Sequence, residues 1–345
     1  MGKALYETGL KDGWQPAIHT LHGKKGKADG NQYFPQLVFT GFESRRIAYV
    51  LKGIAVGRKA ETVLLSHINL LLVGYIIKLF YPRVKLVMLA HGIEVWKPFG
   101  WLKKIMIRKI DLILAVSHFT RDKMQQLHGI PAEKFGVLNN SLDPFLERPL
   151  NKAKDIDLLR RYGLQPANRV LLTVARMSDT ELYKGYDRVI QALAGLVPEY
   201  PGVRYLLVGK YDVQEKKRLD ALIRLHALEA VVLFAGYVPD EELAAHFNLA
   251  DIFIMPSEKE GFGIVFIEAM FYGKPVIAGN KDGSADALCN GKLGLLVDPA
   301  NVAEISGAIK KMLDNTGDHM PDAGMLEVHF GYTGYKKRLA AYLAQ

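Results

Sequence analysis

Short runs of apolar residues alternate with stretches of helical periodicity along the whole chain. Continuous apolar runs are typical of strands buried on both faces, and strands that alternate with helices form parallel sheets covered by helices. The runs predict strands at residues 17–21, 62–66, 84–90, 112–117 and 136–138, and at 170–175, 203–208, 231–235, 252–255, 275–278 and 295–297. The helical stretches are residues 70–80, 101–110, 119–128, 187–197, 215–226, 241–248, 265–272 and 302–313. The sequence therefore predicts an α/β protein with two doubly wound parallel-sheet domains that face a cleft.

The length of 345 residues exceeds what one hydrophobic core usually serves, which favours two domains. A turn-rich and then charged stretch predicts a boundary near residues 145–165. We expect an N-terminal domain over residues 1–150, a C-terminal domain over residues 151–328, and a last helix over residues 329–345 that returns to the N-terminal domain. Doubly wound domains usually open with a buried strand, whereas this chain opens in helix-like sequence at residues 3–7. The N-terminal domain is therefore expected to use another strand order or to lack its first strand–helix unit.

Positive charge is concentrated in the first half of the chain. Residues 1–150 contain 22 Lys and Arg against 11 Asp and Glu, a net charge of +11, and residues 151–345 contain 23 against 25, a net charge of −2. The excess indicates an anionic partner, such as a membrane surface, a phosphorylated acceptor or nucleic acid, and an ordinary soluble basic surface is the alternative. No nucleic-acid recognition motif accompanies the charge, so we expect no nucleic-acid partner.

Cysteine content and hydropathy indicate a cytoplasmic protein. Cys289 is the single cysteine, so the chain can form neither an internal disulfide nor a metal site built from cysteines. The longest apolar run, residues 68–77, is too short to span a bilayer, and the first ten residues do not resemble a signal peptide. We expect a cytoplasmic protein, and the basic half leaves open a position at the inner face of the membrane.

Residues 256–275 carry the clearest chemistry, with the sequence PSEKEGFGIVFIEAMFYGKP. A predicted strand enters a loop with Gly261 and Gly263, and the following helix ends before Gly273 and Pro275. Glycines allow the backbone to approach a ligand closely, and the N–H groups of a helix start favour a diphosphate.

Two glutamates, Glu260 and Glu268, lie eight residues apart in this unit. An ionised carboxylate can accept hydrogen bonds from two hydroxyls of a sugar. The spacing alone also fits two incidental glutamates, but an apolar helix seldom tolerates an unpartnered carboxylate at Glu268. The pattern predicts a nucleotide sugar that lies across the helix start, with one glutamate at each end.

The stretch EGFGIVFIEAMFYGKPVIA closely resembles the signature of retaining GT-B glycosyltransferases of family 4. Further matching stretches are VARM at 174–177, YKG at 183–185, LLVG at 206–209, ADIFIMPS at 250–257, LGLLVDP at 293–299, AHGIEVW at 90–96 and VSHFT at 116–120. The resemblance covers nearly the whole chain and is strongest over residues 165–300. It implies two Rossmann-like domains, a nucleotide-sugar substrate, no bound metal or cofactor, and retention of anomeric configuration without a clear protein nucleophile.

The resemblance also implies roles for individual residues. Arg176 and Lys184 match the pair that holds the diphosphate, where cations stabilise the leaving group as its charge develops. Glu260 would face the sugar and Glu268 the ribose, and His91 matches a histidine that approaches the donor sugar across the cleft. The other predicted donor contacts are Gly209, Ser257, Gly261, Phe262, Gly263 and Ile264. Each charged residue alone also fits a solvated surface position, and a lone histidine also fits a structural role.

Two features depart from the family pattern, and a third resembles a metal-binding motif of other transferases. The family's first strand and its glycine-rich acceptor-side loop have no counterpart before residues 3–7. Residues 282–286 read DGSAD where many relatives carry GGxPE, although Gly283 and Ser284 are still expected to present N–H groups to the donor. The DID sequence at 155–157 matches the metal-binding DxD of other transferases, but it does not follow a buried strand, so we expect no metal site there.

A membrane contact is predicted from residues 101–110, WLKKIMIRKI. Leu102, Met106 and Ile110 share one helical stripe and basic residues share another, as in helices that rest on an anionic membrane. An ordinary helix packed on its sheet is the alternative.

The leading functional prediction is transfer of a sugar from a UDP- or GDP-linked donor to a saccharide or lipid-linked acceptor, as in the assembly of cell-surface polysaccharide or lipopolysaccharide. A catalytically inactive nucleotide-sugar-binding remnant, which lacks the first strand–helix unit, is the alternative. A nucleotide-sugar epimerase on the same fold is also conceivable, but its signatures are not evident in the sequence.

Overall fold

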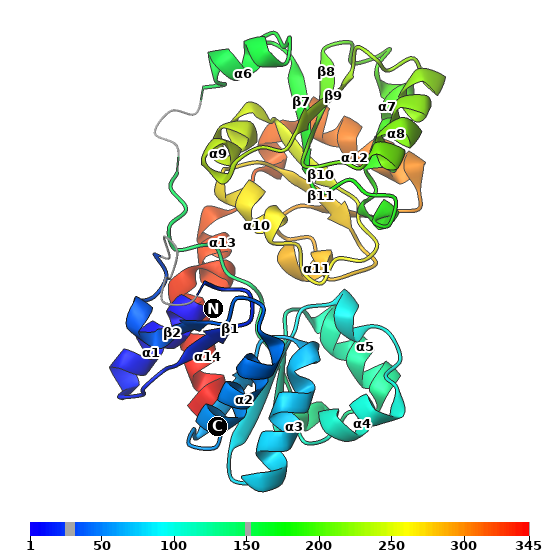
Figure 1. Cartoon of the computed structure of the whole chain (residues 1–345). Helices are drawn as coiled ribbons and strands as arrows, with labels where there is room; N and C mark the ends of the chain where they lie inside the picture. The colour runs from blue at the N-terminus through cyan, green and yellow to red at the C-terminus, as the bar shows by residue number, and fades with distance from the viewer. Residues whose placement is uncertain (25–31, 149–152, 345) are drawn as a thin grey trace. The chain divides into compact units, whose positions relative to one another are not determined.

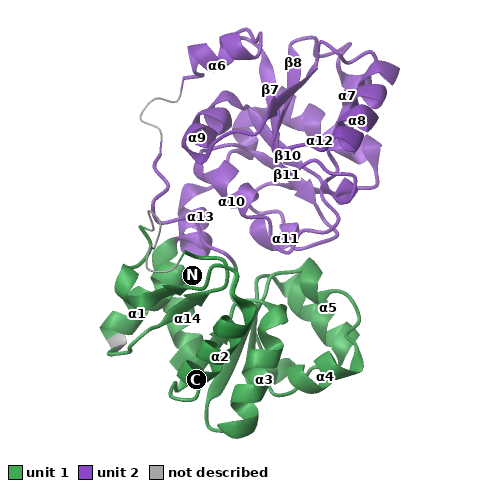
Figure 2. Ribbon diagram, in the orientation of Figure 1, with its two compact units in different colours: residues 1–139, 332–345 green, residues 140–331 purple. Residues whose placement is uncertain are grey.

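The computed structural model describes residues 1–24, 32–148 and 153–344 of the chain. These residues form two compact units, drawn in green and purple in Figure 2. Unit 1 comprises residues 1–139 and 332–345, and unit 2 comprises residues 140–331. The chain therefore passes between the units after Asn139 and after Gly331, whereas the sequence predicted boundaries after residues 150 and 328. Each unit is built on a parallel sheet covered by helices, so the predicted class of a two-domain parallel α/β protein is confirmed.

Unit 2 contains a six-stranded parallel sheet with the order β9-β8-β7-β10-β11-β12 (Figure 1). The strands are β7 (Arg169–Val174), β8 (Val203–Val208), β9 (Val232–Gly236), β10 (Ile252–Met255), β11 (Val276–Gly279) and β12 (Leu295–Val297). The chain starts in the middle of the sheet at β7, winds outward to β9, and then returns to place β10 on the other side of β7. In doubly wound sheets, ligands bind at the carboxyl ends of the strands where the winding reverses, which here is between β7 and β10.

Helices cover both faces of this sheet. They are α6 (Ile156–Arg161), α7 (Tyr186–Leu196), α8 (Val213–Leu225), α9 (Asp240–Leu249), α10 (Ile264–Phe271), α11 (Ser284–Ala287), α12 (Val302–Asp314) and α13 (Ala323–Phe330), with 3-10 turns η5 (Leu182–Lys184) and η6 (Thr316–His319). Successive residues of a strand point to opposite faces. Ile252 and Ile254 of β10 therefore pack in the core with α7 and α12, whereas Phe253 contacts Phe247 of α9 and Phe266 of α10. Burial on both faces explains why β10 is apolar at every position.

The segment before β7 contains a helix, α6, that the sequence did not predict. The Asp155 carboxylate accepts hydrogen bonds from the N–H groups of Asp157 at 2.9 Å and Leu158 at 3.0 Å, and so caps this helix. The first carboxylate of the DID sequence therefore has a structural role. Residues 149–152 of the predicted boundary segment lie outside the described residues.

Unit 1 contains a four-stranded parallel sheet with the order β3-β4-β5-β6 and a separate parallel pair, β1 and β2. The strands are β1 (Ile18–Thr20), β2 (Phe39–Gly41), β3 (Thr62–Leu65), β4 (Lys85–Ala90), β5 (Leu112–Ala115) and β6 (Phe135–Val137). The helices are α1 (Gly2–Asp12), α2 (Arg46–Gly57), α3 (Leu71–Phe80), α4 (Trp101–Ile107), α5 (His118–His128) and α14 (Tyr332–Ala344), with 3-10 turns η1 (Gln36–Val38), η2 (Ile68–Leu70), η3 (Ile93–Val95) and η4 (Ala132–Lys134). In the described residues, no strand precedes α1.

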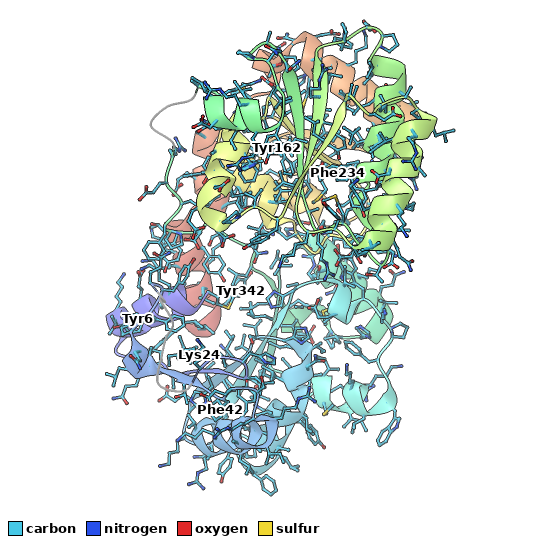
Figure 3. The ribbon with its side chains drawn as sticks, turned by 45° about the horizontal axis from the view of Figure 1, so that its top comes forward. Tyr6, Lys24, Phe42, Tyr162, Phe234 and Tyr342 are labelled. Atoms are coloured by element: carbon cyan, nitrogen blue, oxygen red, sulfur yellow. The ribbon has the colours of Figure 1, made fainter. Side chains whose placement is uncertain are left out.

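The two faces of the four-stranded sheet carry different helices. Core residues of α3, α4 and α5 pack on one face, and core residues of α1 and α14 pack on the other. The C-terminal helix is tied to the sheet because Lys85 of β4 donates to the Tyr342 carbonyl at 3.1 Å and the Tyr342 hydroxyl accepts from the Val137 N–H at 3.1 Å. Tyr342 is labelled in Figure 3. Lys336 of α14 also forms an ion pair of 2.6 Å with Glu7 of α1. Helix α14 is thus part of unit 1.

The apolar stripe that the sequence assigned to a membrane contact faces the core of unit 1 instead. Met106 and Ile110 are buried against the sheet, and only Leu102 of the three is exposed. The prediction for this stripe is wrong, because the stripe supplies the packing that holds α4 on its sheet. Nowhere in the described parts of the chain does a helix combine the length and the apolar character that crossing a bilayer requires.

Candidate active site

The predicted site residues of unit 2 follow the carboxyl ends of its parallel strands. Arg176 and Lys184 lie in the loop after β7, and Glu260 lies in the loop after β10. Gly209 follows β8 directly, and Asp282 lies in the loop after β11. These loops meet at one edge of the sheet, around the point where the winding reverses. The site therefore occupies the position that the topology favours for a ligand.

Lys184 and Glu260 form an ion pair across this point. Their side chains are 18% and 15% exposed, so the pair is largely shielded from solvent. Two features bring the loops together: the Glu258 N–H donates to the Tyr183 carbonyl at 2.9 Å, and Gly185 adopts φ +77° against the Pro256 carbonyl. A side chain at Gly185 would be strained by this φ and would clash with that carbonyl oxygen. The structure thus joins two residues that lie 76 positions apart in the sequence.

Arg176 is held by a different carboxylate. Its guanidinium forms an ion pair with Glu181, and this hydrogen bond raises the pKa of Arg176. The arginine side chain is 64% exposed, so the guanidinium can reach a ligand in solvent. The pKa of Tyr183 is raised to about 12 by burial and by the nearby charges of Glu181 and Glu260. At neutral pH this phenol is protonated.

Asp282 supports the loop that carries Glu260. Its carboxylate is buried and accepts hydrogen bonds from the Glu260 N–H at 2.6 Å, the Ser257 hydroxyl at 2.8 Å and the Ser284 N–H at 2.9 Å. Burial raises the pKa of Asp282 to about 6, although these hydrogen bonds act in the opposite direction. The Gly283 N–H also donates to the Glu260 carbonyl at 2.8 Å. The loops after β10 and β11 are therefore fixed to each other by both N–H groups and side chains.

These contacts bear on two sequence predictions. The N–H groups of Gly283 and Ser284 donate to the Glu260 carbonyl and to the Asp282 carboxylate, so they would have to leave these partners to bind a donor. The Ser257 hydroxyl is buried and donates to Asp282, so it lies beneath the loop rather than on its surface. Asp282 itself was not predicted from the sequence, and its signal was the acidic residue at a position where many relatives carry glycine.

The start of α10 follows the predicted strand–loop–helix pattern. Gly263 precedes the helix with φ +84°, and Phe266 fills the space where a side chain at Gly263 would lie. Phe262 is buried against Phe330 of α13, with ring centroids 5.5 Å apart. Ile264 is exposed at the first position of the helix. The aromatic side chains of this turn are therefore buried, whereas Gly261 and Gly263 remain partly exposed.

Glu268 lies inside α10 and is partly buried. Burial raises the pKa of Glu268, and the nearby carboxylates of Asp143 and Asp240 raise it further. In the described part of the chain no side chain or N–H group donates a hydrogen bond to its carboxylate. A partly buried carboxylate without a donor is costly, which fits a group that binds a ligand hydroxyl.

His91 belongs to unit 1 and follows the carboxyl end of β4. Its Nε2 donates to the Ser66 carbonyl at 2.8 Å, and its backbone N–H donates to the Glu94 carboxylate at 2.6 Å. The ring is exposed and oriented by these contacts.

The structure shows no candidate metal centre among the residues that it describes, since these contain no group of three or more His, Cys, Asp and Glu side chains placed to hold an ion.

Comparisons with known proteins identify the class and then the family. The structure resembles Anabaena HepE in complex with UDP, with a TM-score of 0.76 and 23% identity over 90% of this chain and 86% of that one. It also resembles a glycosyltransferase from Rickettsia africae, with a TM-score of 0.78 and 18% identity over 99% of this chain and 93% of that one. The fold is therefore the GT-B fold, with two Rossmann-like units.

Two family models cover most of the chain. Residues 157–336 match the model of glycosyl transferases group 1, and residues 10–144 match that of glycosyltransferase family 4. The chain belongs to the group 1 glycosyltransferase family, which confirms the resemblance stated from the motifs. Among curated relatives, a GDP-mannose-dependent alpha-(1-6)-phosphatidylinositol monomannoside mannosyltransferase of Mycobacterium tuberculosis is 32% identical over 65% of this chain. That alignment spans 59% of the relative's length. A glycogen synthase of the same organism is 28% identical over 68% of this chain and 56% of that protein.

Proposed function

We propose that the protein transfers a glycosyl group, with retention of configuration, from a UDP- or GDP-linked sugar to a saccharide or lipid-linked acceptor. The observation that carries this proposal is the shielded Lys184–Glu260 pair at the switch point of the unit 2 sheet. The names of similar proteins support both nucleotides, since HepE was solved with UDP and with UDP-glucose and the mycobacterial relative uses GDP-mannose. The printed acceptor of that relative, a phosphatidylinositol monomannoside, supports a lipid-linked acceptor.

In this proposal the two cations exchange partners when a donor binds. Lys184 leaves Glu260 for a phosphate oxygen, and Arg176 leaves Glu181 to bind the diphosphate with its planar guanidinium. Each carboxylate is then released next to the new anion, and Glu260 is free to accept hydrogen bonds from hydroxyls of the sugar. The cations stabilise the diphosphate as negative charge develops on it when the glycosidic bond breaks.

Other residues would position the donor. Glu268 accepts from the ribose hydroxyls, and the backbone from Gly261 to Ile264 lies along the sugar and diphosphate. Ser257 acts through Asp282, which holds the loop. His91 is proposed to approach the donor sugar from unit 1. The nucleotide sugar is a substrate, and we propose that no metal or other cofactor takes part.

Nucleotide binding and turnover test these roles. Isothermal titration with UDP and GDP should give binding by the wild-type protein, and Lys184→Met should weaken it by about 10- to 100-fold, the range expected for loss of a charge-assisted hydrogen bond. Lys310→Met is a matched control, because Lys310 forms an ion pair with Glu199 elsewhere on unit 2 and its loss should leave affinity unchanged. Equal effects of the two substitutions would contradict the assignment of Lys184.

Turnover separates a transferase from a binding protein. Hydrolysis or transfer of a UDP- or GDP-sugar should persist in excess chelator and should fall at least about 100-fold in Glu260→Ala. Absence of nucleoside-diphosphate binding, or full activity of Glu260→Ala, would overturn the proposal. Binding without any turnover would favour the catalytically inactive nucleotide-sugar-binding protein instead.

A further inference from the structure

The loop after β7 carries both Arg176 and Lys184, and residues of the neighbouring α8 region hold it in place. The ladder between β7 and β8 continues past the ends of the two strands. The Met177 N–H donates to the Lys210 carbonyl at 2.9 Å, and the Met177 carbonyl accepts from the Asp212 N–H at 3.1 Å. The backbone next to Arg176 is therefore fixed to the segment that leads into α8.

Asp212 uses its two carboxylate oxygens for two different contacts. One oxygen accepts from the Glu215 N–H at 2.7 Å and caps α8. The other accepts from the Asp179 N–H at 3.1 Å, three residues after Arg176. Hydrogen bonding from the Glu215 N–H lowers the pKa of Asp212, so the carboxylate is ionised at neutral pH. Because one acceptor oxygen is enough to cap a helix, the second oxygen serves the loop.

Arg218 of α8 holds the other end of the loop. Its guanidinium donates to both oxygens of the Glu215 carboxylate, at 2.7 and 2.8 Å, and to the Asp187 carboxylate at 3.1 Å. The Glu215 side chain is 0% exposed, and Asp187 lies in the first turn of α7, three residues after Lys184. Helices α7 and α8 pack against each other, and both are labelled in Figure 1. Apolar packing often stabilises a fold as well as a buried ion pair does, so this bridge fits a role in geometry.

We infer that Asp212 and Arg218 are positioning residues that hold the loop after β7 in the geometry in which Arg176 and Lys184 bind a diphosphate. The inference rests on the proposed function, because it assigns the diphosphate to these two cations. In it neither Asp212 nor Arg218 binds the donor itself. A loop that is ordered before the ligand arrives loses less conformational entropy on binding, so its cations bind more tightly.

Asp212→Ser separates the role in the loop from the cap of α8. Serine is a good helix cap but has one side-chain oxygen, so the variant keeps the cap and loses the contact with Asp179. Isothermal titration with UDP and GDP should show affinity about tenfold weaker than in wild type, the effect of one hydrogen bond to a charged group. Asp322→Ser is a matched control, because Asp322 caps α13 through the Met325 N–H at 2.9 Å. The control should leave nucleotide affinity unchanged, and calorimetry should show similar unfolding temperatures for the two variants.

Two further measurements distinguish positioning from a general loss of stability. Amide hydrogen exchange of residues 176–184 in the ligand-free protein should be faster in Asp212→Ser than in wild type and unchanged in Asp322→Ser. In a protein that already carries Arg176→Met, Asp212→Ser should weaken nucleotide binding further by less than about twofold, because the group that it positions is absent. An independent structural effect would give the same loss in both backgrounds.

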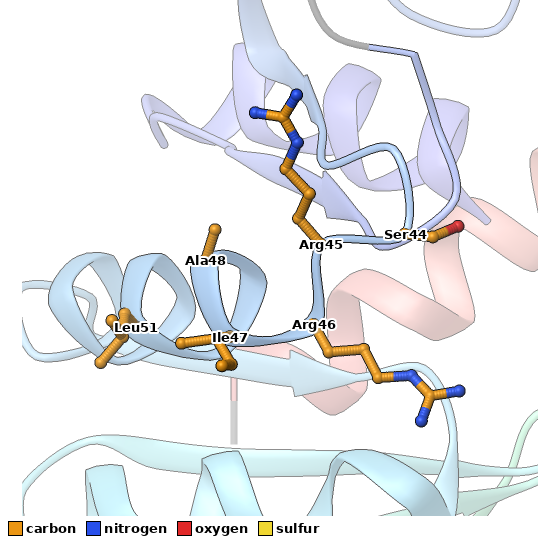
Figure 4. Close-up of a pocket in the computed structure, with 6 residues that line it drawn as sticks. All are labelled: Ser44, Arg45, Arg46, Ile47, Ala48 and Leu51. Carbon is orange, nitrogen blue, oxygen red and sulfur yellow. The ribbon is translucent and has the colours of Figure 1, made fainter.

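Arg218→Lys tests the second contact without leaving a buried carboxylate unpaired. Lysine keeps a positive charge next to Glu215, but its ammonium cannot reproduce the planar fork that reaches two carboxylates. Nucleotide affinity should fall about threefold or more. Arg45→Lys is the matched control, since Arg45 forms an ion pair of 3.4 Å with Glu43 beside the surface hollow at the start of α2, shown in Figure 4. It should leave affinity unchanged.

The outcomes distinguish this inference from the proposed function. Wild-type affinity in Asp212→Ser, unchanged exchange in its loop, or an equal loss in the Arg176→Met background would overturn the inference and leave the proposed function intact. Equal effects of Arg218→Lys and Arg45→Lys would overturn the role of Arg218. Absence of nucleotide binding by the wild-type protein would overturn the proposed function and the inference together, and it would be seen before any substitution is made.

Discussion

Asp282 offers a prediction in which stability and activity change in opposite directions. Its folded-state pKa of about 6 lies above the ordinary value of 3.8, so the folded protein prefers the protonated carboxyl. A raised acid pKa contributes stability that is fully present below pH 3.8 and is lost as pH rises through about 6. The full contribution, about 2.2 units at 1.36 kcal/mol each, is about 3 kcal/mol, and about 1.4 kcal/mol of it is lost between pH 5 and pH 8.

Asp282→Asn removes this titration while keeping the shape of the side chain. Relative to wild type, the variant should therefore gain about 1.4 kcal/mol of stability between pH 5 and pH 8, which corresponds to about 3–6 °C in the unfolding temperature of unit 2. Its activity should fall about 10- to 100-fold, because one amide cannot accept hydrogen bonds from both the Glu260 and Ser284 N–H groups. Calorimetry at several pH values measures the first effect, and kcat/KM for donor hydrolysis measures the second.

Asp298 provides a control with the opposite sign. Hydrogen bonding from the Ala300 N–H lowers the pKa of Asp298, so its stabilising effect is present at neutral pH and is lost in acid. Asp298→Asn should therefore lose stability relative to wild type as pH rises. If the Asp282→Asn variant and wild type had the same pH dependence of stability, or if the variant kept full activity, the assigned role of Asp282 would be refuted.

Two further substitutions test the loop after β7 and the buried histidine of α9, His246. Gly185→Ala should reduce UDP or GDP affinity about tenfold or more and destabilise unit 2 by about 1–3 kcal/mol, because φ +77° and the Pro256 carbonyl both oppose a side chain. Nucleotide affinity equal to that of wild type in isothermal titration would contradict this prediction. Burial lowers the pKa of His246, which contacts the Tyr162 hydroxyl at 2.7 Å, so its stabilising effect is present above pH 6.5 and is lost in acid. His246→Gln should remove that acid-dependent loss in calorimetry, and an unchanged acid slope would assign the loss to other groups.

The sequence predicted the strands well where burial alone determines them. The predicted bounds of β8, β10 and β12 coincide with the observed ones, because each of these strands is a short and mainly apolar run. Helix α2 was not predicted, and the reason is physical: its outer face carries Ile47 and Leu51, so its apolar residues do not follow a one-sided helical pattern.

The site was predicted in its parts but not in its connections. Lys184 and Glu260 were assigned to different ligand groups, and only the structure shows them paired across the switch point. Asp282 was not recognised because its role depends on a contact between the loop after β11 and the loop after β10. A local sequence pattern does not predict such a contact between distant loops. Motifs therefore located the loops that we propose to face the ligand, whereas the tertiary structure shows which groups compete for each carboxylate.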